Sequence, residues 1–438
     1  MRTASPGVAA MKLKSEAFGL LFAVTLTAAA GNMALQSVLP AIGREFGLAD
    51  TLVAFAFALS ALLWTLAAPY WARLSDRWGR KRVMMIGLGG FIASMLGFGV
   101  AATLGLVHWL SAPVAFVLMV FARAIYGLLG SAAPIAAQAY VADRTTRRGR
   151  TRAMSLLASA QGLGTVIGPA MAPFFVLPFV SLAGPMYAFA LMGAVVLVLV
   201  WRRLPSGDVA RHPVQPGAPA GKGLWKDPRV RGFLIYGLLV TGAQAINIAV
   251  LGFHVIDEMG LPGREAQSFI GLAMLSGAAA TLLAQWGLIP LLRLEPRELM
   301  RWGAALALIG NLMSVAAPGY FGVVVGYAVV SMGVGFARPG FTAGSSLAVE
   351  PHEQGAIAGL MMSLAGLSFL APPVIGVALY ELVEPAPFLA NAVLLTAALA
   401  VCFTSAPLRN APSGRRRAVR TVQAPASQPG PEGRQNLD

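Results

Sequence analysis

The chain has 438 residues, of which 57% are hydrophobic and only 12% are charged. Soluble globular domains carry about 25% charged residues, so most of this surface must face lipid, which excludes an ordinary soluble protein. The net charge of +15 would suggest a nucleic-acid partner in a soluble protein. Here the basic residues crowd the loops between apolar runs, as cytoplasmic loops of membrane proteins do, and no nucleic-acid partner is expected. The single cysteine, Cys402, excludes an intrachain disulfide.

The apolar runs are long enough to cross a bilayer, which takes about 20 residues. The first run, from Phe18 to about Ile42, contains Asn32 and Gln36. It exceeds the apolar region of a secretory signal peptide, about 7–15 residues, and is predicted to be a retained helix. The sequence predicts twelve spans, at residues 17–41, 51–71, 83–105, 112–140, 153–178, 183–201, 232–255, 267–292, 299–317, 319–345, 355–380 and 386–405.

Basic residues are distributed unevenly between the two ends of these spans. With twelve spans, one side holds both tails, the central loop and the loops after the second, fourth and eighth spans, and with them nearly all Lys and Arg. The other side holds only Arg44 and Arg264, while Arg123 and Arg338 lie within spans. Because basic loops stay in the cytoplasm, we expect a multi-pass protein of the cell inner (plasma) membrane with both termini cytoplasmic.

The domain organisation follows from a loop rich in Pro and Gly in the middle of the chain. A weak internal repeat supports two halves: Ala142 precedes Gly149 by seven residues, as Ala348 precedes Gly355, and a span rich in small residues follows each pair. The fold class expected is an all-α integral membrane protein with two pseudo-repeated six-helix bundles. The predicted parts are a cytoplasmic N-tail (1–16), a first bundle (17–203), a cytoplasmic linker (204–230), a second bundle (231–405) and a disordered cytoplasmic tail (406–438).

The loop after the second span reads Ala-Arg-Leu-Ser-Asp-Arg-Trp-Gly-Arg-Lys over residues 72–81. A positively charged cytoplasmic loop with a turn glycine would explain the cations alone. The fixed spacing, however, resembles the Gly-x-Leu-Ala-Asp-Arg-x-Gly-Arg-Lys motif of the major facilitator superfamily, with Ala72 and Ser75 as departures. The resemblance implies a latch between the two halves on the cytoplasmic side, formed by Asp76, Arg77, Gly79, Arg80 and Lys81.

The fourth span carries an arginine about ten residues from its start. Arg123 is followed by Tyr126 and Gly127, and the fragment resembles the Arg-x-x-Gln-Gly motif of the same superfamily, with Tyr126 in place of Gln. A charge at this depth is costly in lipid, so we expect Arg123 to face the protein interior or water. The alternative is a side chain that extends to the membrane interface.

The fifth span contains Gly164, Gly168 and Pro169 in a Gly-x-x-x-Gly-Pro pattern. Small residues every four positions allow close helix packing, and a generic packing face would produce the same pattern. The pattern also resembles the motif of drug and tetracycline exporters of the superfamily, although Ala172 and Pro173 stand where those exporters have two glycines. The resemblance covers about residues 17–405 and implies the drug:proton antiporter branch, in which two bundles rock around a cavity at the membrane midplane.

The predicted cavity contains neutral polar groups and two cations. No Asp or Glu lies in the middle of a predicted span, and two arginines without a carboxylate favour a neutral or acidic substrate. Arg338, which precedes Pro339, could instead cap carbonyls exposed by a kink. The candidate substrate and proton cavity comprises Asn32, Gln36, Arg123, Tyr126, Gln161, Gln244, Asn247 and Arg338. The titratable residues nearest to it are His254, Asp257 and Glu258, which are candidates for proton handling.

The expected function is secondary active export of a small molecule in exchange for protons by a monomer in the lipid bilayer. No Gly-x-x-x-x-Gly-Lys-Ser/Thr loop is present, so ATP-driven pumping by this chain is not expected. Neither a catalytic site, nor a metal site, nor a cofactor is predicted. Two alternatives stay open: an uptake symporter for an organic solute on the same fold, and a membrane receptor or scaffold that transports nothing.

Overall fold

The computed structural model describes residues 15–145, 147–178, 180–205, 223–316, 319–350, 353–405 and 408. These residues are helical apart from turns, short connections and one isolated antiparallel bridge between Leu177 and Ser181. The predictions for the N-tail, most of the central linker and the C-terminal tail concern residues outside this set. The all-α fold predicted from the sequence is confirmed for the residues described.

The first bundle ends at Arg203. Its elements are α1 (Ser15–Glu45), α2 (Asp50–Trp78), α3 (Arg80–Leu106), α4 (Ala112–Ile125), the π-helical turn η1 (Tyr126–Gly130), α5 (Ala132–Arg144), α6 (Arg147–Met171), the 3-10 turn η2 (Ala172–Phe175) and α7 (Gly184–Arg203). α4, η1 and α5 together form one span.

The second bundle follows a short 3-10 turn, η3 (Leu224–Lys226). Its elements are α8 (Pro228–Met259), α9 (Gly263–Leu282), the π-helical turn η4 (Leu283–Leu288), α10 (Ile289–Leu292), α11 (Pro296–Ala316), α12 (Tyr320–Leu347), α13 (Gln354–Ser368), α14 (Pro372–Leu382) and α15 (Ala386–Thr404). The Asp227 carboxylate caps the start of α8 by accepting from the backbone N–H of Arg229 at 2.8 Å. Hydrogen bonds from Arg229 lower the pKa of that carboxyl.

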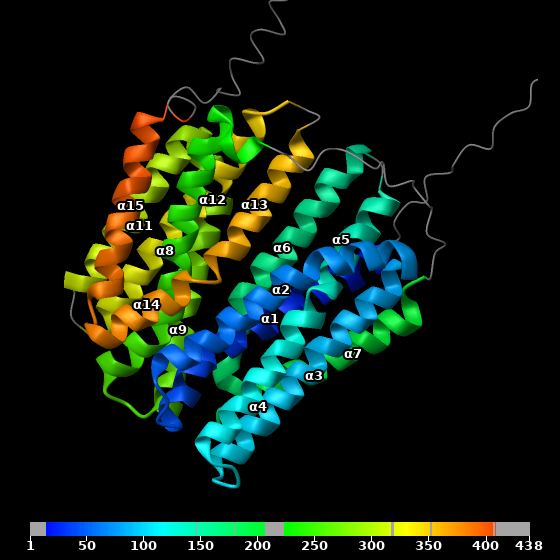
Figure 1. Cartoon of the computed structure of the whole chain (residues 1–438), viewed down its shortest axis with the longest axis vertical. Helices are drawn as coiled ribbons and strands as arrows, with labels where there is room; N and C mark the ends of the chain where they lie inside the picture. The colour runs from blue at the N-terminus through cyan, green and yellow to red at the C-terminus, as the bar shows by residue number, and fades with distance from the viewer. Residues whose placement is uncertain are drawn as a thin grey trace, which may run out of the picture.

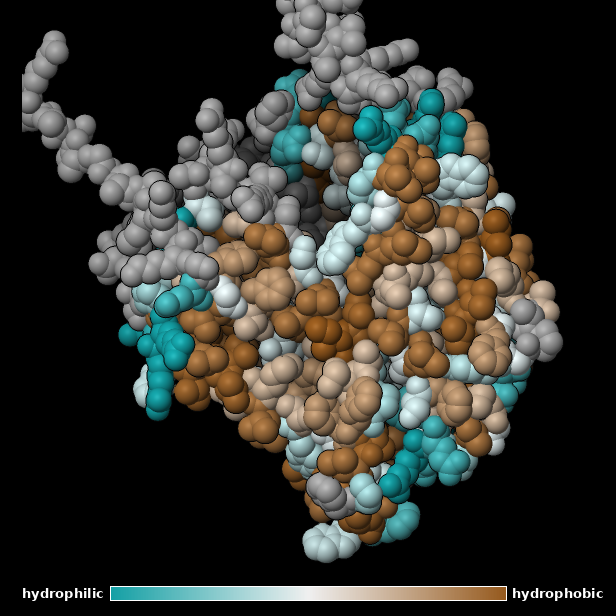
Figure 2. Space-filling view, turned by 180° about the vertical axis from the view of Figure 1, so that it is seen from behind, coloured by the Kyte–Doolittle hydropathy of each residue, from teal (hydrophilic) through white to brown (hydrophobic). Residues whose placement is uncertain are grey.

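Eleven of these helical segments are long and apolar enough to cross a membrane. The remaining predicted span, 153–178, coincides with most of α6 and with η2. α6 begins with several arginines, which lower its mean hydropathy. Large apolar side chains such as Phe121, Leu191 and Val393 are 65–70% exposed around the outside of the protein. Figure 2 shows one face that is mainly hydrophobic, with hydrophilic groups at its margins. A surface of this kind suits lipid and not water.

The helices pack mainly within their own bundle. α1 packs on α6 and α7, and α3 packs on α4, α5 and α7; in the second bundle α12 packs on α11, α9 and α8, and α15 packs on α11 and α8. The two groups lie side by side (Figure 1) and meet through α1 with α8 and α9, α6 with α9, and α2 with α13 and α14. A motion of one bundle against the other would therefore change the contacts of the residues that face this boundary.

Candidate functional site

Arg123 lies inside the first bundle and is only 3% exposed. Its guanidinium lies 4.8 Å from the ring centroids of both Phe57 and Tyr126, and its Nη2 donates to the Asn32 Oδ1 of α1 at 3.0 Å. Cation–π contacts stabilise a desolvated guanidinium by about 2 kcal/mol or more each. The Nε and Nη1 atoms have no hydrogen-bond partner. We call Arg123, Asn32, Phe57 and Tyr126 the arginine cage.

The backbone around the cage is irregular. Tyr126 opens the π-helical turn η1, and such turns inside α-helices are frequent at functional sites. Gly127 follows it, and a Cβ there would lie 2.6 Å from the Ser60 carbonyl oxygen of α2. The glycine therefore allows α2 to approach the turn, and Trp64 of α2 stacks on Tyr126 with ring centroids 5.3 Å apart.

Among the predicted cavity residues, Asn32 and Tyr126 are the two whose contacts with Arg123 the structure gives; the others have the following environments. Gln36 lies one turn beyond Asn32 on α1, and its Oε1 is buried without a hydrogen-bond partner. Asn247 is 3% exposed and donates to the Ala243 carbonyl of its own helix at 3.0 Å, so its amide is engaged in α8. The remaining three are partly or fully accessible: Gln244 is half-buried, and Gln161 and Arg338 are exposed.

Residues 72–81, predicted to be a loop, instead form the end of α2, the single connecting residue Gly79 and the start of α3, and their contacts lie within the first bundle. Arg80 forms ion pairs with Asp76 and with Asp143 of α5, the latter at 2.9 Å. Lys81 donates to the Trp201 carbonyl at the end of α7 at 2.7 Å. Gly79 separates α2 from α3 with φ of 92°, a conformation that favours glycine. The partners found for Asp76 and Arg80 among the residues described are therefore in their own bundle, and the exposed Arg77 extends from the same turn.

The glycines of the fifth predicted span allow α6 to pack closely against α1. A Cβ at Gly164 would lie 2.6 Å from the Ala29 Cβ, and one at Gly168 would lie 2.2 Å from the Ala30 carbonyl oxygen. Pro169 adds a contact across the boundary, because a Cβ on Gly271 of α9 would lie 3.1 Å from its carbonyl oxygen. The motif thus packs helices inside one bundle and touches the other bundle at the same place.

The three candidate proton-handling residues have separate environments. His254 is 8% exposed, packs edge-to-face against Tyr380 and at a tilt against Phe388, and has no hydrogen-bond partner on either ring nitrogen among the residues described. Glu258 accepts from the Gly319 backbone N–H at 2.5 Å, just before α12 begins, so it acts as a helix cap. Of the three, Asp257 is the one that contacts the other bundle.

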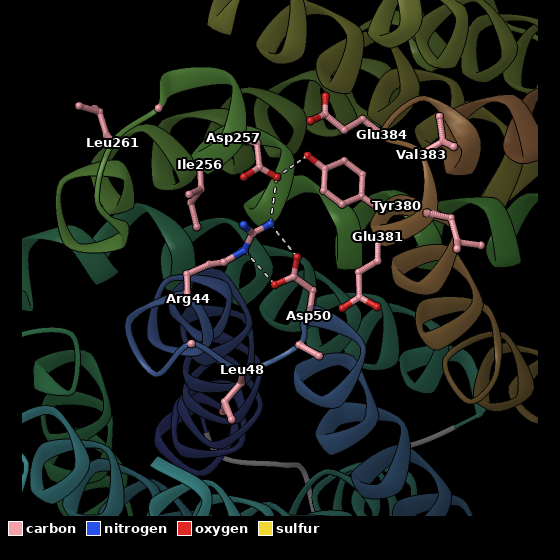
Figure 3. A pocket seen from close by; sticks show the side chains of 14 residues that line it. Arg44, Leu48, Asp50, Ile256, Asp257, Leu261, Tyr380, Glu381, Val383 and Glu384 are labelled. Atoms are coloured by element: carbon pink, nitrogen blue, oxygen red, sulfur yellow. Dashed lines mark hydrogen bonds and ion pairs between the residues drawn. The ribbon is translucent and has the colours of Figure 1, made fainter. Parts of the chain in front are cut away.

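Asp257 belongs to a polar network that joins the two bundles (Figure 3). Its Oδ2 accepts from Arg44 Nη2 at 2.9 Å and from the Tyr380 hydroxyl at 2.8 Å. Arg44 also donates from two nitrogens to Asp50 at 2.9 and 2.7 Å. In the same region, Glu381 Oε1 accepts from the Thr51 backbone N–H at 2.9 Å. The network lies at the end that carries the α1–α2 and α8–α9 connections, which we call the outer end.

The network lines a cavity of about 1000 Å³ at the outer end. Of its members, Asp257 alone is among the candidate site residues chosen from the sequence. One feature of the sequence could have identified Arg44 and Asp50 as members. Arg44 is one of only two basic residues that the sequence assigns to its side, and Asp50 follows it closely. At the opposite end, the ion pairs Arg80–Asp143 and Arg229–Glu353 each stay within one bundle.

The chain is similar to known transporters over most of its length. The profile of the Major Facilitator Superfamily matches residues 21–290. The chain is 28% identical to the tetracycline resistance protein, class C, of Escherichia coli over 385 residues, 84% of this chain and 91% of that protein. It is 24% identical to multidrug resistance protein 2 of Bacillus subtilis (strain 168) over 368 residues, 80% of this chain and 86% of that protein.

A solved structure supports the same fold. A bacterial homolog to the human lysosomal transporter Spinster, crystallised in an inward-facing and unoccupied conformation, superposes with a TM-score of 0.71 at 15% identity. The match covers 92% of this chain and 100% of that chain. The predicted resemblance to drug-efflux transporters is confirmed, and the protein is a multi-pass membrane transporter and not an enzyme. The chain belongs to the Major Facilitator Superfamily.

Proposed function

We propose that this chain exports a small neutral or acidic organic compound in exchange for protons, as a monomer in a bacterial inner membrane with both termini in the cytoplasm. Export is favoured by the relatives of this chain, which are tetracycline and multidrug resistance proteins. Polar contacts join the bundles at the outer end, and the two ion pairs described at the opposite end, Arg80–Asp143 and Arg229–Glu353, each lie within one bundle. This arrangement suits an inward-facing state. That state would accept a substrate from the cytoplasm.

The charge of the substrate is inferred from the arginine cage. Arg123 is the observation that carries this proposal: it is buried, its contacts are one amide oxygen and two aromatic rings, and two of its nitrogens lack a partner. A buried cation without a carboxylate repels cations and attracts anions or electron-rich neutral groups. The free donors of Arg123 can then bind a carboxylate or an enolate oxygen when the bundles move and the cage opens.

The test compares substrates of different charge in everted membrane vesicles energised to make a proton gradient. Fluorescein, which is anionic at neutral pH, tetracycline and the permanent cation ethidium form the panel. We expect vesicles with the protein to accumulate fluorescein or tetracycline above empty-vector vesicles and not ethidium. Accumulation of ethidium alone would contradict the charge assignment. Uptake into right-side-out vesicles alone would favour the symporter, and no flux of any solute would favour the receptor or scaffold.

A further inference from the structure

The start of α11 packs beside the end of α15 at the end of the protein opposite the outer end, which we call the inner end (Figure 1). Arg301, in the second turn of α11, places its guanidinium carbon 4.4 Å from the ring centroid of Phe403, in the last turn of α15. Arg297 lies four residues before Arg301 and therefore on the same face of α11. The side chains of Trp302 and Phe403 are both exposed. We call Arg297, Arg301, Trp302 and Phe403 the basic–aromatic patch.

The charge of Arg301 is not neutralised by the part of the chain that the structure describes. Its side chain is half-buried, and its Nε is buried without a hydrogen-bond partner. None of the ion pairs found among the described residues includes it. Glu298, the acid within α11, instead accepts from the backbone N–H of Glu295 at 2.9 Å. The aromatic contact stabilises the cation but leaves its charge in place, so the guanidinium retains donors for an anion.

The basic–aromatic patch lies on the side of the second bundle that faces lipid. The opposite side of α11 packs on α12, where a Cβ on Gly310 would lie 2.5 Å from the Val330 backbone nitrogen. Toward the outer end, the side of α11 that carries Arg301 continues with Ile309 and Leu312, which are both exposed. The boundary between the bundles is formed by other helices of the second bundle, namely α8, α9, α13 and α14. An anion that reaches the patch therefore comes from the membrane or the water beside it, and not from between the bundles.

The first bundle has a similar arrangement at its equivalent pair of helices. α3 and α7 are its third and sixth spans, as α11 and α15 are those of the second bundle. Lys81, at the start of α3, donates to the Trp201 carbonyl at the end of α7 at 2.7 Å, and the Arg202 guanidinium lies 5.9 Å from the Trp201 ring centroid. Trp201 is exposed. Cations beside an exposed aromatic ring thus occur at the inner end of both bundles, as expected of a feature that serves the membrane surface.

We propose that the basic–aromatic patch binds the headgroup phosphate of an anionic phospholipid and so joins α11 to α15 at the inner end. Arginine binds phosphate through two nitrogens, and basic pockets between membrane helices bind anionic lipid headgroups. Aromatic side chains such as Trp302 and Phe403 prefer the level of the headgroups, where the acyl chains of the same lipid can run along Ile309 and Leu312. The inference goes beyond the proposed function, because it needs neither a transported compound nor proton exchange.

The test counts lipids bound to the purified full-length protein in detergent by native mass spectrometry. Phosphatidylglycerol and phosphatidylcholine with the same acyl chains are the probes, because both carry a phosphate but only the first has a net negative charge. We expect tighter binding of phosphatidylglycerol by the parent. In Arg301→Ala one bound phosphatidylglycerol should be weakened about fivefold, and in Arg297→Ala combined with Arg301→Ala on the order of thirtyfold, the loss expected for one and two cations near an anionic lipid.

Two further variants separate the patch from charge in general. Arg231→Ala is the matched control, because it removes an exposed arginine at the inner end, in the first turn of α8, and it should bind phosphatidylglycerol as the parent does. Phe403→Leu keeps every charge but removes the ring beneath Arg301, and it should also weaken one bound phosphatidylglycerol. Binding of phosphatidylcholine should be the same in all variants.

Thermal unfolding in the same detergent gives a second readout and shows which variants are folded. A ligand that binds the folded state stabilises it, so phosphatidylglycerol should raise the unfolding temperature of the parent and of Arg231→Ala, and that of Arg301→Ala by less. Equal binding of the two lipids by the parent, or a folded Arg301→Ala that binds phosphatidylglycerol as the parent does, would overturn the proposal. Displacement of the lipid by millimolar inorganic phosphate would overturn it in favour of a site for small anions.

Discussion

Arg123 is a charged residue inside a bundle, and two of its hydrogen-bond donors have no partner. Two aromatic faces and one amide replace part of its hydration, and the in-plane donors Nε and Nη1 stay unpaired. An unpaired buried donor costs about 1–3 kcal/mol, so a stable fold would not keep two without a compensating use. Binding of an acidic group during transport is that use in our proposal.

We therefore predict that Arg123→Lys retains part of the export activity and Arg123→Ala almost none. Lysine keeps the charge but lacks the planar fork that stacks between two rings and binds an anion through two nitrogens. The measurement is initial export of fluorescein in everted vesicles at matched expression. Arg264→Ala, which removes an exposed arginine at the outer end, should transport as the parent does. Normal transport by Arg123→Ala would show that the arginine cage does not bind the substrate.

The helix pair α1 and α6 depends on the absence of side chains at specific positions. Gly168 faces the Ala30 backbone, where a Cβ would lie 2.2 Å from the carbonyl oxygen. Real Cβ atoms do not approach backbone so closely, so any larger residue must separate the two helices. In lipid, such close packing is a main source of helix association, because the hydrophobic effect does not drive helices together there.

We predict that Gly168→Val lowers the thermal unfolding temperature and abolishes export, while Gly162→Val is tolerated. Gly162 lies on the same helix, and a Cβ there meets nothing within 4 Å, so it is a control for helix propensity. Overpacking of a tight contact costs about 1–3 kcal/mol. Thermal unfolding of the purified proteins and vesicle export measure the two effects. Equal loss in both variants would mean that helix propensity, and not the contact with α1, explains the result.

At the junction of α2 and α3, two carboxylates are arranged around one arginine. Arg80 contacts Asp76 and Asp143 together. We predict that Asp76→Asn reduces export several-fold while expression stays near that of the parent, because Arg80 then loses one of its two ion-pair partners. Glu45→Gln, an exposed carboxylate near the outer end of α1, is the control. Unchanged export by Asp76→Asn would leave the loop only a role in topology.

Sequence reasoning located the helices well and the interactions between them poorly. In lipid the backbone must satisfy its own hydrogen bonds, so long apolar runs can only be helices, and each predicted span coincides with helical structure. The interruption of the eleventh span, where α13 ends at Ser368 and α14 begins at Pro372, follows from adjacent prolines. The π-helical turns η1 and η4 were not predicted, because packing against other helices decides them.

The polar network at the outer end was not predicted from the sequence, for a different reason. Arg44 and Asp257 are 213 residues apart in the chain, and no local pattern reveals that the end of α1 meets the end of α8. Only the arrangement of the two bundles brings them together (Figure 1). The arginine cage was partly predictable, because a charge in the middle of a span must be buried in protein or water; Phe57, its aromatic partner on α2, was not.

The orientation of the whole molecule is the property on which the functional argument depends most. Export from an inward-facing state and a substrate entering from the cytoplasm both require the α1–α2 end to face away from the cytoplasm. The sequence assigns nearly all Lys and Arg to the other side and only Arg44 and Arg264 to this one. Charge bias of this size sets orientation during insertion because cationic loops are retained in the cytoplasm.

We predict that reporter fusions after Gly217, in the central linker, and after Gly263, at the start of α9, report opposite sides of the membrane. Alkaline phosphatase should be active after Gly263 and inactive after Gly217, and green fluorescent protein should give the reverse, because α8 crosses the membrane between the two sites. Replacing Arg264 by Ala should leave the result unchanged, since the bias does not rest on it. If both fusions report the same side, the twelve-span topology is wrong. Opposite sides in the inverted order would keep the fold and place the polar network of the outer end on the cytoplasmic side.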